Sequence, residues 1–207
     1  MSGLTHAKPV LLLTLIALVS IAVLSRIEYT TRERVAENEL AYKSEQLRAV
    51  LAETSYDNEP WSSAIDITDA AGKPITVYPV TAHKKLIAWV IETAGTRGYV
   101  APIKLLTAVN TSEASPTIIG VRIAAHRETP GLGDKIEAAR SDWILQFAGR
   151  SLNDPAPDRW TTRKDGGDFD QISGATVTSR AVISGVRKSL TTLANNQQAI
   201  EGKLTND

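Results

Sequence analysis

Two short segments of this 207-residue chain combine glycines with polar side chains that could bind a ligand. The first is Asp170-Gln-Ile-Ser-Gly-Ala-Thr176, in which small neighbours leave the Thr176 hydroxyl sterically open. Gly174 permits a backbone conformation that larger residues rarely adopt. A helix is predicted to begin near Thr178, and free N–H groups and the dipole at a helix start favour a phosphate. Taken alone, such a segment is more often an ordinary helix cap.

The second segment is Glu128-Thr-Pro-Gly-Leu-Gly133. Its Pro-Gly pair suits the two central positions of a type II turn, and its last glycine precedes the next predicted helix. Such a turn exposes backbone N–H groups and places the polar side chains of Glu128 and Thr129 where a strand ends. Taken alone, it is more often a plain strand-to-helix connection, and it lacks the Lys-Ser/Thr pair of a phosphate-cradling loop.

The composition excludes several other kinds of site. The chain has no cysteine, which excludes disulfides, Cys-ligated metal or iron–sulfur centres, a thiol nucleophile and a thioether link to a cofactor. Its three histidines are too scattered for a zinc cluster, so no metal site is predicted. Lys+Arg and Asp+Glu both total 23, and this balance argues against a nucleic-acid partner.

The N-terminal region carries an apolar run. The 17 residues between Lys8 and Arg26 are uncharged, and as a helix they would be about 26 Å long, at the short end of spanning length. A cleaved signal peptide is the alternative, but the run is long for one and lacks a clear Ala-x-Ala site. We therefore predict a retained transmembrane helix at residues 9–27, preceded by a tail at 1–8. The Lys and Arg count of the flanks slightly favours a cytoplasmic C-terminal side.

An amphipathic stalk helix is predicted to follow over residues 28–56. Residues 29–53 lack Gly and Pro, and a break is predicted at 57–60. Four apolar residues of this region fall at helical spacings: Leu40, Leu47, Val50 and Leu51.

Residues 57–207 are predicted to form a single α+β domain, in which antiparallel strands pack with helices. Because the strands precede the helices, a βαβ repeat is disfavoured. A loop is expected at 163–170, and Asp134 with Glu137 resembles a helix-capping pair. The expected strands are two within 64–80, around a turn at 71–74, and one each at 86–91, 103–109 and 117–124. The expected helices are 135–147 and one from Thr178 onward.

In this order, the two segments resemble the hallmarks of the FMN-binding domain family. The stretch 169–179 looks like the family's attachment motif, Ser/Thr-Gly-Ala-Thr, whose last threonine carries FMN through a phosphoester. The stretch 128–133 is similar to the family's second hallmark. An anchor, a stalk and one such domain in a chain of this length are similar to the G subunits of Rnf-type electron-transport complexes.

The resemblance implies covalent FMN on Thr176, with Ser173, Gly174 and Ala175 completing the motif. Asp170 would be the first residue of the motif, and a flavin transferase would recognise it during maturation. The residues expected beside the flavin ring are Glu128, Thr129, Leu132 and Gly133.

One departure from the family pattern is visible. The stretch Gly98-Tyr-Val-Ala-Pro-Ile103 replaces the more usual Gly-Tyr-x-Gly-x-Ile, so a flavin contact at the second glycine is not carried over.

The implied function is that of an electron-carrying, FMN-bearing subunit of a membrane ion-translocating ferredoxin:NAD oxidoreductase, a translocase. Its partners would be the other membrane and peripheral subunits, and the chain alone would complete no turnover. The resemblance places the chain in the inner membrane of the cell as a single-pass protein with its domain in the periplasm, against the Lys and Arg count.

Two alternatives stay open. The homologous FMN-bearing C subunit of a sodium-translocating NADH:quinone reductase shares both motifs but is generally longer. A flavin-free anchored scaffold, in which residues 173–176 only cap a helix, belongs to a different class. A denaturing gel viewed under ultraviolet light would separate this scaffold from a covalent flavoprotein, whose band stays fluorescent.

Overall fold

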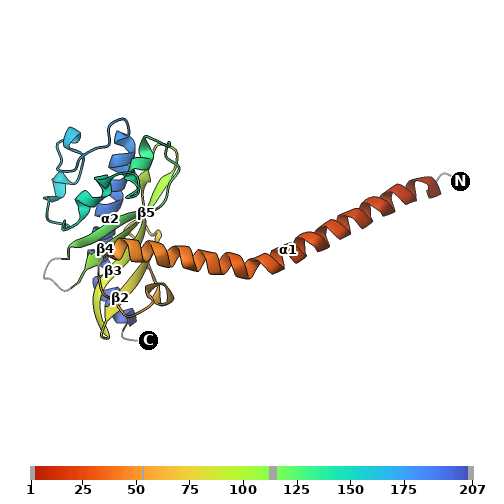
Figure 1. Cartoon of the computed structure of the whole chain (residues 1–207), viewed down its shortest axis with the longest axis horizontal. Helices are drawn as coiled ribbons and strands as arrows, with labels where there is room; N and C mark the ends of the chain where they lie inside the picture. Colours follow the sequence, from red (N-terminus) through yellow and green to blue (C-terminus); the bar gives the residue numbers. More distant parts are fainter. Residues whose placement is uncertain (1–2, 53, 112–115, 205–207) are drawn as a thin grey trace. The chain divides into compact units, whose positions relative to one another are not determined.

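The computed structural model describes residues 3–52, 54–111 and 116–204 (Figure 1). The chain forms two compact units, and the boundary between them lies between Ser44 and Glu45.

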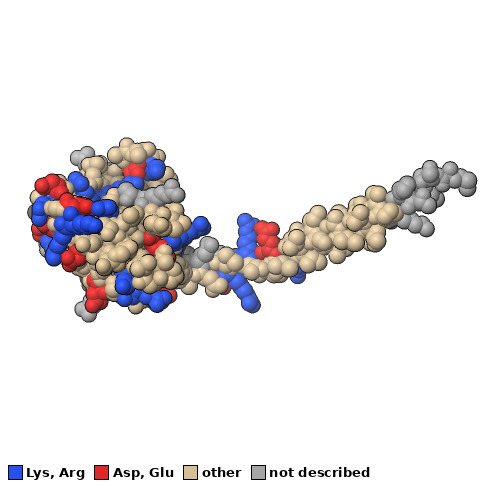
Figure 2. All heavy atoms as spheres, turned by 90° about the horizontal axis from the view of Figure 1, so that it is seen from above, with Lys and Arg blue, Asp and Glu red and all other residues tan. Residues whose placement is uncertain are grey.

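The first unit is helical. It contains most of α1, which spans Gly3–Leu51. Within α1, the stretch Pro9–Arg32 is long and apolar enough to cross a membrane, and its mean hydropathy is 2.5. Figure 2 shows that this stretch begins with a length of helix free of charged side chains. α1 ends at Leu51, before the predicted break at 57–60, because Ala52 adopts a left-handed conformation (φ 50°) that cannot continue a helix.

The second unit contains a five-stranded antiparallel sheet whose strand order follows the chain. The expected strands are confirmed, and most extend a few residues beyond their predicted ends. Neighbouring strands are consecutive in the chain, so each pair is joined by a short connection, as antiparallel pairing allows. The strands are β1 (Ile65–Thr68), β2 (Pro74–Ala82), β3 (Lys85–Arg97), β4 (Pro102–Asn110) and β5 (Ile118–Ala125).

One face of the sheet is covered by α2 (Thr176–Leu204), drawn in blue in Figure 1. The predicted apolar stripe of this helix, which includes Val182, Val186 and Leu190, is buried in the main core. Helix and sheet approach closely at two glycines, since a Cβ added at Gly185 would lie 2.9 Å from the Gly95 Cα. The predicted α+β class is thereby confirmed.

The opposite face of the sheet has its own core. Leu47, Val50 and Leu51, in the last turns of α1, pack there with residues of β2, β3 and β4 such as Val80 and Val90. Part of the predicted stalk range, 28–56, therefore belongs to the folded unit.

The predicted helix at 135–147 is wrong. Two short 3-10 helices take its place, η2 (Gly133–Ile136) and η3 (Asp142–Phe147). Ser141 between them has an extended backbone; its hydroxyl donates to the Lys135 carbonyl and accepts from the Trp143 N–H, so its side chain competes with helical hydrogen bonds.

The predicted capping pair is also wrong. Asp134 lies inside η2, whose N-cap is Leu132, and the Glu137 carboxylate pairs with His126.

Residues 148–175, which we call the connecting segment, join η3 to α2. Besides isolated β-bridges, they contain two short 3-10 helices, η4 (Pro157–Arg159) and η5 (Arg163–Asp165), of which the second lies in the predicted loop. Arg180 on α2 holds Asp165 of this segment through two hydrogen bonds of 2.6 Å.

Candidate functional site

An open hollow of about 500 Å³ lies at the start of α2 and brings together most of the predicted site residues. One wall comes from the loop after β5: Glu128, Thr129, Leu132 and Gly133. The other comes from the attachment motif and the first turn of α2: Gly174, Ala175, Thr176, Val177 and Thr178. Tyr99, from the turn between β3 and β4, completes the lining.

The loop after β5 forms the predicted type II turn. The Leu132 N–H donates to the Thr129 carbonyl at 3.1 Å, and Gly131, the third residue, has a φ of 79°. A positive φ at this position is what a type II turn requires of its glycine.

The attachment motif contains a second turn of the same hydrogen-bonding pattern. The Ala175 N–H donates to the Ile172 carbonyl at 3.0 Å, and Gly174 has a φ of 80°, so the predicted need for glycine is confirmed. A Cβ added at Gly174 would lie 3.4 Å from the Leu132 side chain. The two turns therefore pack against each other.

Thr176 is the first residue of α2. The Ala175 carbonyl accepts the Ser179 N–H at 3.0 Å, which makes Ala175 the N-cap and leaves the N–H groups of the first three helical residues without intrahelical partners. The Thr176 side chain is half-buried and lines the hollow, and among the described residues no side chain or carbonyl holds its hydroxyl. A free hydroxyl and free N–H groups thus coincide at one end of the hollow.

Ser179 fixes the motif, a role that sequence reasoning missed. Its buried hydroxyl accepts the Ile172 N–H at 2.9 Å and donates to the Ala175 carbonyl at 3.1 Å. It therefore ties the turn before Thr176 to the first turn of the helix. A serine three residues after the motif threonine is the signal that could have indicated this.

Glu128 is buried and holds three segments together. One carboxylate oxygen, Oε1, accepts the Tyr99 N–H at 3.0 Å, and Oε2 accepts the Thr178 hydroxyl at 2.5 Å. Gly98 and Gly133 both lie against this side chain, because a Cβ at either position would collide with it. Both oxygens are therefore already hydrogen-bonded within the protein.

His126 supports the same loop. Its Nδ1 accepts the Glu128 N–H at 3.1 Å, and its Nε2 lies 2.5 Å from Glu137 Oε1. Because Nδ1 accepts a hydrogen bond, the proton of the neutral ring is on Nε2 and points to Glu137.

Exposed apolar side chains surround the hollow. Tyr99, Leu132 and Val177 line it and are 74%, 47% and 46% exposed. Exposed apolar surface beside a few fixed polar groups is typical of a ligand site.

The remaining predicted residues lie outside the lining of the hollow. Asp170 and Ser173 are exposed on the connecting segment, and the Asp170 carboxylate pairs with Arg163 at 3.0 Å. Ala101, where the family pattern has glycine, accepts the Gly98 N–H at 2.9 Å. Among the residues that the structure describes, no group of three or more metal-ligating side chains comes together.

A second hollow, of about 460 Å³, lies further along α2. Three cationic residues line it: Lys73, Arg187 and Lys188. Its one carboxylate, Asp69, binds the Lys188 ammonium at 2.7 Å.

Comparisons with known proteins identify the class. Residues 98–191, which include both turns, match the FMN-binding domain family. The fold resembles a crystal structure of the C subunit of the Na(+)-translocating NADH-quinone reductase from Parabacteroides distasonis. The TM-score is 0.54 and the identity 20%, over 79% of this chain and 94% of that one, which shows a shared fold alone. The second unit thus contains an FMN-binding domain, matched over residues 98–191.

Two relatives indicate which kind of FMN-binding protein this is. Both are named as the G subunit of an ion-translocating oxidoreductase complex. The protein from Cereibacter sphaeroides is 43% identical over 181 residues, or 87% of this chain and 81% of the relative. That from Pseudomonas aeruginosa is 38% identical over 194 residues, or 92% and 89%. The chain belongs to the family of G subunits of ion-translocating oxidoreductase complexes, and it is an FMN-bearing electron-transport protein.

Proposed function

We propose that the chain carries FMN through a phosphoester to Thr176 Oγ1 and relays electrons within a membrane ion-translocating ferredoxin:NAD oxidoreductase. The observation that carries this proposal is the Thr176 hydroxyl, which is free and opens into the hollow beside the free N–H groups of α2. A phosphate at this place would meet N–H donors and the positive end of the helix dipole. When bound, FMN supplies one-electron or two-electron redox chemistry.

The walls of the hollow suit the flavin ring. Tyr99, Leu132 and Val177 offer exposed apolar surface that a flat ring would cover. The Glu128 carboxylate brings negative charge to the same wall, which disfavours added electrons on a neighbouring group. Thr129 and Gly133 complete this wall, and Ser173, Gly174 and Ala175 hold the turn that presents Thr176.

Attachment requires a second protein. We propose that a flavin transferase recognises Asp170, which is exposed at the start of the motif. In forming the phosphoester, Thr176 Oγ1 would attack the flavin-side phosphorus of a flavin dinucleotide. The new O–P bond replaces the phosphoanhydride bond, AMP leaves with the electron pair, and the hydroxyl proton passes to a base of the transferase. No atom changes oxidation state.

We further propose a single-pass topology in the inner membrane. Residues 1–8 would lie in the cytoplasm, 9–27 in the membrane and 57–207 in the periplasm. The proposed stalk of 28–56 would run into the folded unit, which begins at Glu45. The apolar stretch Pro9–Arg32 supports the span, and the family resemblance supports the orientation. A reporter active only in the periplasm and fused after Asp207 should be active; activity of only a cytoplasmic reporter would contradict the orientation.

The proposed linkage is tested on the purified full chain from a cell that contains the transferase. We expect a fluorescent band on a denaturing gel, and a peptide carrying the mass of FMN less one water. Fragmentation should place this mass on Thr176 rather than on Ser173 or Thr178. A flavin that is released by denaturation would contradict the covalent linkage.

A further inference from the structure

The stretch that leads into Thr176 alternates between buried and exposed side chains. Three buried apolar side chains anchor it at three-residue spacing: Phe169, Ile172 and Ala175. The Phe169 ring lies 5.0 Å from Phe147 and 4.8 Å from Trp160, between ring centroids. Between the anchors, Asp170 and Ser173 are exposed and Gln171 is half-buried.

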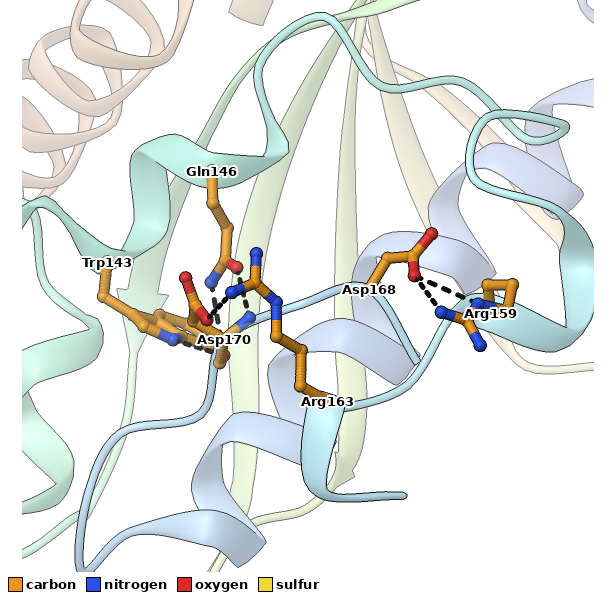
Figure 3. Close-up of polar contacts among 6 residues, drawn as sticks. All are labelled: Trp143, Gln146, Arg159, Arg163, Asp168 and Asp170. Carbon is orange, nitrogen blue, oxygen red and sulfur yellow. Dashed lines mark hydrogen bonds and ion pairs between the residues drawn. The ribbon is translucent and has the colours of Figure 1, made fainter. Parts of the chain in front are cut away.

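The backbone of Asp170 is held by two side chains of η3, as Figure 3 shows. The Trp143 indole N–H donates to the Asp170 carbonyl at 2.7 Å. The Asp170 N–H donates to Gln146 Oε1 at 2.8 Å, and Gln146 Nε2 lies 3.5 Å from the Asp170 carbonyl. We call this arrangement the η3 clamp; it consists of Trp143 and Gln146 on the peptide groups of Asp170.

The clamp fixes the backbone and leaves the Asp170 carboxylate accessible. Water could make the hydrogen bonds that the peptide groups of an exposed residue need. The two side chains that bind the Asp170 backbone are therefore not required to satisfy its polar groups. The carboxylate forms an ion pair with Arg163, in which the Asp170 and Arg163 side chains are 61% and 66% exposed. Such exposed pairs contribute little to stability.

We propose that Trp143 and Gln146 are positioning residues for the modification of Thr176. The clamp, together with Ser179, holds residues 170–176 in one conformation, and this surface is what the flavin transferase docks on. Attachment then follows folding of the domain, because η3 and the motif meet only in the folded chain. This inference rests on the proposed attachment at Thr176.

The test uses the full chain, purified in detergent from a host without the transferase. The chain is mixed with the transferase and flavin adenine dinucleotide, and the initial rate of covalent labelling is read from in-gel fluorescence. Trp143→Phe removes the indole N–H and keeps an aromatic ring, whereas Gln146→Met removes both amide contacts at similar length. Each should label at least about fivefold more slowly, because each loses one or more hydrogen bonds to the Asp170 backbone.

Arg159→Gln is the matched control. It removes the Arg159–Asp168 ion pair of the same segment, which makes no contact with Asp170 (Figure 3). It should label within about twofold of the unmodified chain, because no hydrogen bond to the motif is lost. Once fully labelled, all three variants should match the unmodified chain in flavin spectrum and potential, because the clamp acts on attachment and not on the bound ring.

Three results would overturn the inference. They are labelling of Trp143→Phe and Gln146→Met at the unmodified rate, an equal slowing in Arg159→Gln, and labelling of the urea-unfolded chain as fast as the folded one. If the unmodified chain takes no label under any condition, the proposed attachment itself fails. A labelled chain without the expected slowing leaves that attachment intact.

Discussion

The two hollows along α2 are similar in size, about 500 and 460 Å³, and differ in chemistry. The first lies at the helix start, where the N–H groups are free, and has apolar side chains on its rim. The second lies along the helix interior, where N–H groups are satisfied by the helix, and depends on side chains for its charge. Size alone therefore does not indicate which hollow would take the proposed phosphate-linked flavin. The free N–H groups and the apolar rim favour the first hollow.

The carboxylates of the two hollows differ in the groups that bind them. Glu128 in the first hollow accepts hydrogen bonds from a neutral hydroxyl and an N–H group. Asp69 in the second is bound by the Lys188 ammonium and by the N–H groups of Ala71 and Lys73. The Lys188 hydrogen bond is the main reason that the pKa of Asp69 is lowered. A carboxylate without a cation can act on a neighbouring cofactor, whereas a neutralised one acts mainly on the fold.

The largest expected effect appears when one threonine of each hollow is replaced with valine. Thr176→Val should abolish covalent flavin and cost about 1 kcal/mol or less in unfolding free energy, because the hydroxyl holds nothing in the fold. Thr191→Val, in the second hollow, should keep its flavin, since the Thr191 hydroxyl only donates to the Arg187 carbonyl of its own helix. In-gel fluorescence and flavin-to-protein ratio measure both. Flavin retained on Thr176→Val would contradict Thr176 as the attachment site.

Thr178→Val should behave differently from both. Thr178 is 2% exposed, and its hydroxyl donates to Glu128 Oε2, so valine would leave that buried oxygen without its donor. We expect a loss of about 1–3 kcal/mol in unfolding free energy, with covalent flavin retained. Urea denaturation of the labelled chain measures this loss. An unchanged midpoint would show that the Glu128 contact contributes nothing to the fold.

Glu128→Gln sharpens the contrast between the carboxylates. The amide oxygen can accept the Tyr99 N–H and the amide nitrogen can donate to the Thr178 hydroxyl, so the fold should survive. Removing the negative charge should raise the flavin potential by tens of millivolts, roughly the interaction of charges several ångströms apart in a partly screened site. Asp69→Asn is the control and should leave the potential unchanged. A redox titration in which both variants match the unmodified chain would limit Glu128 to a structural role.

A substitution in the second hollow should change the stability of the fold and leave the flavin content unchanged. Lys188→Met removes the cation from Asp69 and should lower the melting temperature by about 2–5 °C, with unchanged flavin content. A thermal scan followed by circular dichroism measures the shift. Lost flavin in this variant would show that the two hollows are coupled.

The smallest effect concerns pH. The pKa of Asp165 is lowered, chiefly by its hydrogen bonds with Arg180, so its folded value lies below its unfolded value. Its contribution to stability is therefore present above about pH 4 and is lost as pH falls through the folded pKa. The difference in melting temperature between the unmodified chain and Asp165→Asn should shrink from about pH 7 toward about pH 3. A constant difference would contradict the role of the ion pair.

Local features of the chain were predictable from the sequence. Apolar stretches rich in β-forming residues, separated by turn residues, indicated all five strands. The Pro-Gly and Ser-Gly pairs indicated glycines at positive φ, which Gly131 and Gly174 adopt. These features depend on sterics and burial within a few neighbouring residues. The helix at 135–147 failed because apolar spacing cannot show that the Ser141 side chain will replace the backbone hydrogen bonds on which a helix depends.

The tertiary structure alone decided which groups meet at the site. Glu128 and Thr178 lie 50 residues apart and share a hydrogen bond, and Trp143 reaches the Asp170 carbonyl across 27 residues. No local pattern encodes such contacts, because they form only when the loop after β5, η3 and the start of α2 are packed around the same core. The sequence by itself indicated Thr176 as the proposed acceptor and the glycines that the two turns need. The burial of Glu128, the neutral donors that hold it and the clamp on Asp170 arise from packing, which brings distant side chains within hydrogen-bonding distance.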